Sequence, residues 1–160
     1  MRGDLNVIEY LNKGLRSELT AMNQYWLHYR LLDNWGYKTL AKKWHEESIE
    51  EMQHADKLIV RIIFLDGMPN MHVLDPLHIG QTVKEVLDND LELEMAARVL
   101  YQEAATHCHS VKDYVSRDLF EKLMHDEEEH IDLLETQLDL VGKLGLELYA
   151  QHHIGRAEDD

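Results

Sequence analysis

Two short Glu-x-x-His units in this sequence each place a carboxylate and an imidazole three residues apart. The first unit is Glu51 with His54, and the second is Glu127 with His130. Residues three apart lie on one face of a helix, so each unit can offer an oxygen and a nitrogen donor to the same metal ion. One such pair is common by chance in a chain rich in Glu and His, so a metal site requires further support.

A fixed spacing supplies that support. Each half of the chain carries a lone Glu 33 residues before the Glu of its Glu-x-x-His unit, and a constant offset of 76 residues relates the two halves. A tyrosine in the apolar stripe of each half follows the same offset. The chain therefore reads as two helix hairpins of equivalent design, packed about an approximate twofold axis. The pairs that the offset relates are Glu18 and Glu94, Glu51 and Glu127, His54 and His130, and Tyr25 and Tyr101.

The elements that must position these residues read as helices. Apolar residues recur at alternating steps of three and four along long segments, and both prolines of the chain fall between residues 68 and 76. Each apolar stripe is interrupted near its middle by ionisable residues. We therefore expect an all-α fold, with helices at about 4–35, 38–66, 82–110 and 113–142 and a short fifth helix at about 146–154.

The connections between these helices predict how the bundle is wound. Gly36 is suited to a left-handed C-cap, and the short connection there favours antiparallel packing of the first two helices. Residues 66–82 lack a helical pattern, and a connection of this length lets the second and third helices run parallel. The sequence thus predicts one four-helix-bundle domain over residues 1–160, with residues 155–160 as a frayed end.

Burying the repeated residues at one level of such a bundle would be costly without a metal. Four carboxylates and two imidazoles would converge, and the apolar stripes contain no Lys or Arg to neutralise them. An unpaired buried charge costs on the order of several kcal/mol, and carboxylates also repel one another. Two divalent cations would balance the four carboxylates, and mixed oxygen and nitrogen donors suit iron or manganese. The pattern predicts a dinuclear site of the kind known in di-iron carboxylate bundles.

The composition excludes several classes of partner. Among 160 residues there are 16 Lys and Arg against 31 Asp and Glu, and the net charge of −15 argues against nucleic acid and anionic membranes and favours metal cations. No stretch is long and apolar enough to span a membrane, and the N-terminus lacks the apolar region of a signal peptide. Cys108 is the single cysteine, so an intramolecular disulfide is impossible and we expect a cytoplasmic location.

Six segments distributed along the chain carry a more specific pattern: "GDLNVIEYLN", "NQYWLHYRLLDNWG", "EESIEEMQHADKL", "RIIFLDGMPN", "DYVSRDLFEKL" and "DEEEHIDLLETQLDL". Together, and in this order, they resemble the bacterioferritin family, the haem-containing branch of the ferritin-like di-iron proteins. The resemblance covers essentially the whole chain. It implies a ferritin-like four-helix bundle with a long crossover between helices two and three and a short fifth C-terminal helix.

The resemblance also implies roles for the residues that the spacing had selected. The reaction would be the oxidation of two Fe²⁺ ions to Fe³⁺ by dioxygen or hydrogen peroxide. Glu51 and Glu127 would bridge the two irons, and Tyr25 would lie beside them as a hydrogen-bonding or redox-active neighbour, the alternative being a packed core tyrosine. The implied ferroxidase ligands are Glu18, Glu51, His54, Glu94, Glu127 and His130.

Met52 gains a role only through the resemblance. It lies about 100° around the helix from Glu51, which directs it toward a flank where another subunit could dock. In the family the matching methionine binds haem b, and two copies from twofold-related subunits fill both axial positions of one haem per subunit pair. The family also forms a hollow 24-subunit shell of twofold dimers that stores a ferric mineral, with a ferredoxin as the expected partner for iron release.

The carboxylates next to the expected ligands leave one further site open. Some members of the family carry a His and an Asp at the positions held here by Glu46 and Glu50. An iron site on the inner surface of the shell is therefore undecided from the sequence. Glu50 and Asp126 are the better candidates for it.

Five other residues admit more than one interpretation. The tract His107, Cys108 and His109 resembles a metal-binding tract, but adjacent helical residues diverge by about 100°, which works against a shared metal. His152 and His153 would either line a channel in the shell or be solvated.

Three functions are compatible with the sequence. The leading one is a haem-containing iron-storage ferroxidase. The second is a non-storing di-iron oxidase or peroxidase on the same bundle, and the third is a haem-binding electron-transfer shell whose di-iron site is inactive. The native mass and the rate of Fe(II) oxidation separate the three.

Overall fold

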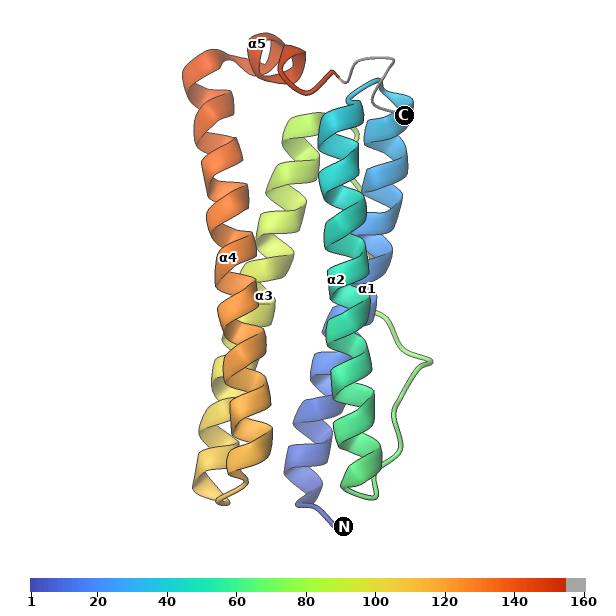
Figure 1. Cartoon of the computed structure of the whole chain (residues 1–160), viewed down its shortest axis with the longest axis vertical. Coiled ribbons are helices and arrows are strands. Elements are labelled where there is room, and N and C mark those ends of the chain that lie inside the picture. The colour runs from blue at the N-terminus through green and yellow to red at the C-terminus, as the bar shows by residue number, and fades with distance from the viewer. Residues whose placement is uncertain (155–160) are drawn as a thin grey trace.

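The structure, a computed structural model of the chain, describes residues 1–154. These residues form five helices and no strand, and the predicted four-helix bundle with a long crossover and a short fifth helix is confirmed (Figure 1). Residues 155–160, predicted as a frayed end, lie outside the described residues. The helices are α1 (Leu5–Asn34), α2 (Lys38–Phe64), α3 (Val83–Ser110), α4 (Tyr114–Leu144) and α5 (Leu146–Gln151).

The helix boundaries differ from the predicted ones by at most three residues. We expected the fourth helix to end at residue 142, but α4 continues through Gly142, whose Cα faces open space. A single glycine costs a helix about 1 kcal/mol, which the packing of α4 overcomes. The helix ends at Gly145, where the backbone turns to a φ of +79°. The short helix α5 ends at Gln151 instead of residue 154.

The four long helices pair as two antiparallel hairpins, α1 with α2 and α3 with α4 (Figure 1). Gly36 ends the first hairpin turn with a φ of +94°, as its predicted capping role requires. The crossover then runs along the bundle, so that α2 and α3 point the same way. None of the helices within residues 1–154 is long and apolar enough to cross a membrane.

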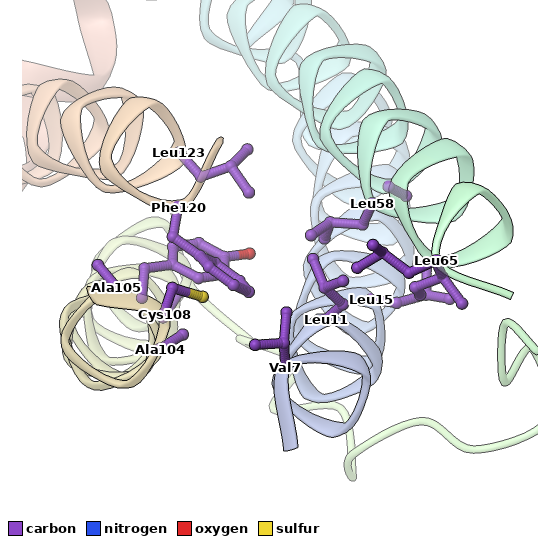
Figure 2. Close-up of a cluster of buried hydrophobic side chains, with 14 of the residues drawn as sticks. Val7, Leu11, Leu15, Leu58, Leu65, Ala104, Ala105, Cys108, Phe120 and Leu123 are labelled. Carbon is purple, nitrogen blue, oxygen red and sulfur yellow. The ribbon is translucent and has the colours of Figure 1, made fainter. Parts of the chain in front are cut away.

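Apolar side chains fill the bundle in two clusters, with a polar layer between them. Figure 2 shows the first cluster, in which the start of α1 and the end of α2 face α3 and α4. Its labelled members are Val7, Leu11, Leu15, Leu58, Leu65, Ala104, Ala105, Cys108, Phe120 and Leu123. The second cluster includes Tyr25, Leu32, Leu40, Trp44, Val86, Leu87, Leu134 and Val141, and it extends to Tyr149 of α5.

The crossover, residues 65–82, contains no helix or strand, yet much of its main chain is hydrogen-bonded to α1. Every fourth residue along one face of α1 contributes a polar side chain to this contact. The crossover therefore follows a ladder of α1 side chains, which satisfies backbone groups that would otherwise depend on water. In order, Asn12 binds the main chain of Met68 and Asn70, Arg16 pairs with the Asp75 carboxylate, and Thr20, Gln24 and His28 accept from the N–H groups of Asp75, His78 and Gly80.

Asp113 connects the N-terminus of α4 to the last turn of α2. Its carboxylate accepts the main-chain N–H of Ser116 at 2.9 Å and the Ser116 hydroxyl at 2.6 Å, and it accepts an N–H of Arg61 at 3.0 Å. Burial raises the pKa of Asp113, but the hydrogen bonds from Ser116 and the charge of Arg61 outweigh it and hold that pKa below its ordinary value of 3.8. One side chain thus serves as a helix cap and as an ion-pair partner.

We predict that Asp113→Ala lowers the free energy of unfolding by about 1–2 kcal/mol, because it removes both the cap and the ion pair. Asp113→Asn should cost less, since Asn can also cap a helix. Because the folded pKa is depressed, the charge stabilises the protein above pH 3.8, and the difference between wild type and Asp113→Asn should vanish as the pH falls through the folded pKa. Thermal unfolding between pH 3 and 7 measures this.

The exposed Asp118 in the same helix provides a matched control. Among the described residues it forms an ion pair with Lys122 across one turn of the surface, so Asp118→Asn should leave the free energy of unfolding nearly unchanged. Equal losses for Asp113→Ala and Asp118→Asn would contradict the assigned role of Asp113.

Candidate metal centre

The fold brings all six expected ligands to one level of the bundle, between the two apolar clusters. Each residue is at most 5% exposed to solvent. All four long helices contribute, with one residue each from α1 and α3 and two each from α2 and α4. The six residues are Glu18, Glu51, His54, Glu94, Glu127 and His130.

The donor atoms form two overlapping groups. In the first group, one donor atom each from Glu18, Glu51, His54 and Glu127 lies within 4.8 Å of the others. In the second group, Glu51, Glu94, Glu127 and His130 do the same. Glu51 and Glu127 belong to both groups, which is the arrangement that two metal ions sharing bridging carboxylates require.

Both imidazole rings turn the Nδ1 atom toward this centre. Nδ1 of His54 lies 3.5 Å from a carboxylate oxygen of Glu18 and 3.5 Å from one of Glu127. Nδ1 of His130 lies 3.1 Å from an oxygen of Glu51 and 3.5 Å from one of Glu94. The two rings are nearly parallel, with centroids 6.2 Å apart, so they approach the centre from the same side.

Several of the atoms that face the centre have no hydrogen-bond partner. A buried polar atom without a partner costs roughly 1–3 kcal/mol, more if it is charged, so a concentration of such atoms calls for a ligand. The residues present therefore fit a pair of divalent cations held by oxygen and nitrogen donors. The partnerless buried atoms at the centre are Oε2 of Glu18, Oε1 of Glu51, both carboxylate oxygens of Glu127, and Nδ1 of His54 and His130.

A second layer of carboxylates binds the far side of each imidazole. Nε2 of His54 lies 3.0 Å from Asp126, and Nε2 of His130 lies 3.0 Å from Glu50 and 2.8 Å from Glu47. A carboxylate at Nε2 orients the ring and leaves Nδ1 available to a metal, which is the usual second-layer arrangement around a ligating His.

These second-layer residues were not predicted to bind the histidines. Their signal was nevertheless present in the sequence, because Glu50 and Asp126 are also 76 residues apart and so occupy equivalent positions in the two halves. Each of them contacts the histidine of the opposite half. Glu46, the other residue considered for an inner-surface site, is exposed.

The two tyrosines related by the offset each donate a hydrogen bond to one lone Glu. Tyr25 donates to Oε1 of Glu94 at 2.7 Å, and Tyr101 donates to Oε1 of Glu18. Burial, and then the negative charge of nearby carboxylates, raises the pKa of both phenols well above 10. Both tyrosines therefore remain protonated donors at neutral pH.

The charges of the centre are unevenly distributed. Burial raises the pKa of Glu51 well above its ordinary value, and the charges of Glu18 and Glu127 raise it further. Burial also opposes ionisation of Glu18, but the close approach of Glu51 and His54, together with the hydrogen bond from Tyr101, outweighs it and lowers the pKa of Glu18. For His54 burial favours the neutral ring, yet the carboxylates of Glu127 and Glu18 raise its pKa to about 10. Cations entering the centre must therefore displace protons.

Met52 lies apart from the six. Its side chain is 48% exposed, and it points out of the bundle although it follows Glu51 directly. Ile49, three residues earlier on the same face of α2, is also exposed. One turn of α2 thus carries two inward-facing ionisable residues and an outward-facing thioether.

The remaining histidines point in separate directions. The His107 ring packs against Tyr10 at a tilt, and His109 contacts Arg117. Cys108, which lies between the two histidines in the sequence, is fully buried. Burial raises the pKa of its thiol to about 12. The tract from 107 to 109 therefore does not converge, as the helical geometry predicted. In the C-terminal segment, His152 is exposed, whereas the His153 ring packs on Tyr149 of α5.

Comparisons with known proteins agree with this geometry. Residues 8–144 match the family model of the ferritin-like domain. The chain is 58% identical to a bacterioferritin of Brucella melitensis, with 99% of each chain covered, and 46% identical to one of Mycobacterium tuberculosis, with 98% of each covered. It also superposes with a TM-score of 0.97, at 52% identity over 99% of both chains, on a Rhodobacter capsulatus bacterioferritin solved with a metal-free dinuclear site and a haem iron in a crystallographic special position.

We predict opposite stability effects for two isosteric changes in the metal-free protein at pH 7. Glu51→Gln should raise the free energy of unfolding by about 1 kcal/mol or more, because burial and like charges make this carboxylate unfavourable. Glu18→Gln should lower it, because the ionised form of Glu18 is the favoured one. Each kcal/mol corresponds to about 2–4 °C in Tm for a chain of this length. Thermal unfolding in the presence of a chelator measures both.

The raised pKa of Glu51 determines how the stability difference between wild type and Glu51→Gln changes with pH. The folded pKa of Glu51 lies above its unfolded value of 4.5, so the wild type loses stability as the pH rises above 4.5, and the advantage of Glu51→Gln should grow over that range. Glu92→Gln, an exposed change in α3, serves as the control. Added Mn²⁺ should stabilise the wild type more than either centre variant. Shifts of the same sign for the two centre variants would contradict this account.

Proposed function

This chain belongs to the bacterioferritin family of ferritin-like proteins, and on that premise we propose that it stores iron and oxidises Fe(II) at a di-iron ferroxidase centre. The observation that carries the proposal is the set of partnerless donor atoms on Glu18, Glu51, Glu127 and the two histidines. These atoms are buried, they face one another, and their chemistry suits iron.

The proposed substrate is a pair of Fe(II) ions, each of which gives up one electron to dioxygen or hydrogen peroxide. Glu18 with His54 would hold one ion and Glu94 with His130 the other, while Glu51 and Glu127 bridge them. Four carboxylates balance two divalent charges, so binding converts a repulsive cluster into a neutral one. After oxidation the extra positive charge is no longer balanced, which favours release of Fe(III) toward the storage cavity.

Protons must move when iron binds, and the residues of the centre are placed to give them up. The pKa values of Glu51 and His54 are both raised, so proton binding to these two side chains competes with cation binding in the metal-free centre. Asp126 and Glu50 contact the far nitrogens of the histidines and are only partly buried. They would accept the imidazole protons and connect the centre to solvent.

Family membership also supports a multi-subunit shell. We propose a homo-oligomeric 24-subunit shell of twofold dimers, with one haem b between each pair of subunits and Met52 from both subunits as axial ligands. Exposure of Met52 on a face of α2 that also carries Ile49 supports this, because two equivalent copies can meet across a twofold axis. The haem would pass electrons from a ferredoxin to stored Fe(III) during release.

We predict that Glu94→Ala slows aerobic Fe(II) oxidation by at least about tenfold, because it removes one donor and the acceptor of the Tyr25 hydrogen bond. The initial rate of absorbance increase from Fe(III), at two Fe(II) per chain, measures this. Glu92→Ala is the matched control, since Glu92 is exposed in the same helix two residues away. An unchanged rate in Glu94→Ala would overturn the ferroxidase proposal and favour a shell with an inactive centre.

The haem site has its own test. Met52→Leu should remove the low-spin haem absorption of the purified protein to below about a tenth of the wild-type level, because Leu keeps the volume but has no sulfur donor. Met95→Leu should leave the haem content unchanged, since Met95 is a similarly exposed methionine that directly follows a centre residue. Retention of haem in Met52→Leu, or a native mass of only one or two chains for the wild type, would contradict the proposed assembly.

A further inference from the structure

A second buried polar group lies beside the metal centre, and no residue of it belongs to the expected ligand set. Asp90 of α3 is its hub, with a side chain that has no exposure to solvent. Its carboxylate accepts hydrogen bonds from Gln24 at 2.8 Å, from His28 at 2.9 and 3.0 Å, and from the indole Nε1 of Trp44 at 2.7 Å. All three donors are also buried. The group joins α1, α2 and α3.

The hydrogen-bond roles in this group determine where the protons sit. Gly80 donates its main-chain N–H to Nε2 of His28, so Nε2 carries no proton and the proton lies on Nδ1, facing Asp90. An indole Nε1 can only donate. The amide of Gln24 is oriented by the N–H of His78, which binds its oxygen and leaves its NH₂ to Asp90. Asp90 thus faces donors alone, the arrangement that suits an ionised carboxylate.

Trp44 connects this carboxylate to the metal centre. Its ring lies against Tyr25, with centroids 6.2 Å apart, and the Tyr25 hydroxyl donates to Glu94 of the centre. The order along this path is therefore Asp90, Trp44, Tyr25 and Glu94. Aromatic rings at this separation are in van der Waals contact, so an electron can pass between them without crossing solvent.

The other half of the chain lacks this arrangement, although it repeats the tyrosine. The offset of 76 residues that relates Tyr25 to Tyr101 places Phe120 at the equivalent of Trp44 and Gly14 at the equivalent of Asp90. Phe120 does pack on Tyr101, with centroids 5.9 Å apart. Gly14 has no side chain, and a Cβ there would already lie in tight contact, 3.2 Å from the Tyr101 ring. At these equivalent positions, a tryptophan with a carboxylate proton acceptor is therefore present on the Tyr25 side of the centre and not on the Tyr101 side.

We propose that Trp44 is an electron donor to the centre, acting through Tyr25, and that Asp90 is the positioning residue that accepts the indole proton. The proposal rests on the ferroxidase function and concerns hydrogen peroxide reacting when only one Fe(II) is bound. Peroxide needs two electrons and two protons to form two molecules of water. Fe(II) gives one electron and becomes Fe(III), and Trp44 gives the other.

The electrons and protons of this reaction balance, and the residues that transfer them are in contact with one another. The indole of Trp44 loses one electron, and its Nε1 proton moves to Oδ2 of Asp90, 2.7 Å away. Tyr25 relays the electron: it releases its phenolic proton to Glu94 as its own electron leaves and regains both when Trp44 is oxidised. The two protons that form water come from solvent. The products are Fe(III), two waters, a neutral indolyl radical and a neutral Asp90.

This donor would protect the shell from partial reduction of peroxide. A single Fe(II) can supply only one electron, and one-electron reduction of peroxide releases a hydroxyl radical. A second electron from Trp44 completes the reduction and leaves the oxidising equivalent on a buried side chain. Deprotonation by Asp90 makes that electron easier to remove, because the developing positive charge on the ring is neutralised within the buried group.

The experiment is rapid-freeze electron paramagnetic resonance after peroxide is added to protein loaded with one Fe(II) per chain. Wild-type protein made with ring-deuterated tryptophan should give a narrowed radical signal, and protein made with ring-deuterated tyrosine should retain the tryptophan signal. No substitution is needed for this comparison. Trp26→Phe/Trp35→Phe, which leaves Trp44 as the only tryptophan of the three in the chain, should keep the signal.

Three variants separate the assigned roles. Trp44→Phe, which makes this half resemble the other, should lose the tryptophan radical and leave a tyrosine signal. Tyr25→Phe should reduce the tryptophan radical at least about tenfold by removing the relay, whereas the matched Tyr101→Phe, which removes only the hydrogen bond to Glu18, should reduce its yield far less. A tryptophan signal that persists in Trp44→Phe, or that Tyr25→Phe and Tyr101→Phe reduce equally, would overturn the proposal.

A metal-free measurement keeps this proposal separate from the ferroxidase function. In the Trp26→Phe/Trp35→Phe background, a flash-generated one-electron oxidant should produce the neutral radical of Trp44. Adding Asp90→Asn should produce the protonated cation radical instead, because the proton acceptor is gone. The same radical form with and without Asp90 would overturn the role of Asp90 even if Fe(II) oxidation is normal. Absent Fe(II) oxidation with the expected change of radical form would count against the ferroxidase function alone.

Discussion

The burial of four carboxylates and two imidazoles at one level of the bundle is the constraint on which the rest of this structure depends. The six include no Lys or Arg, and several of their atoms have no partner in the protein. Such a layer destabilises a metal-free chain, so stability must come from elsewhere in the same helices. It comes from the two apolar clusters, one on each side of the layer, which the long helices can supply because each continues for several turns beyond its ionisable residues.

Polar contacts at the periphery reinforce those clusters. The crossover would be a poorly ordered segment if its main chain depended on water, but side chains at every fourth position of α1 bind it. The last two of these, Gln24 and His28, also reach Asp90 inside the bundle. The crossover on the outside of the bundle is therefore connected, through Gln24 and His28, to the packing around Trp44. Residue 80 of the crossover must be a glycine to approach this closely, because a Cβ there would lie 2.5 Å from the main chain of Val86.

The spacing of ionisable residues predicts the six residues of the centre. Residues three or four apart share one face of a helix, and the repeated offset places equivalent residues of the two halves at the same level of the bundle. The same offset relates Glu50 to Asp126, but the prediction for these two residues concerned an inner-surface iron site and missed their contacts with the histidines. Asp90 could not have been found this way. It has no equivalent in the other half, and its partners lie 46 to 66 residues away on two other helices, a set that periodicity within one helix does not reveal. The outward position of Met52 follows from its place after Glu51, whereas its role as a haem ligand came from the resemblance alone.

Asp90 has no equivalent in the other half of the chain, and this makes the two sides of the centre different. In the proposed centre two equivalent halves would bind two ions, and nothing in that symmetry distinguishes one ion from the other. Trp44 and Asp90 on one side, against Phe120 and Gly14 on the other, break the symmetry just outside the ligand layer while the tyrosine hydrogen bonds on both sides are kept. The tyrosine hydrogen bonds to the centre are thus alike on the two sides, and under the proposal made above the two sides differ in how easily an electron is removed. A buried carboxylate that accepts hydrogen bonds from three side chains costs stability unless every donor is held in place. Main-chain N–H groups of the crossover hold two of the three donors to Asp90, namely Gln24 and His28.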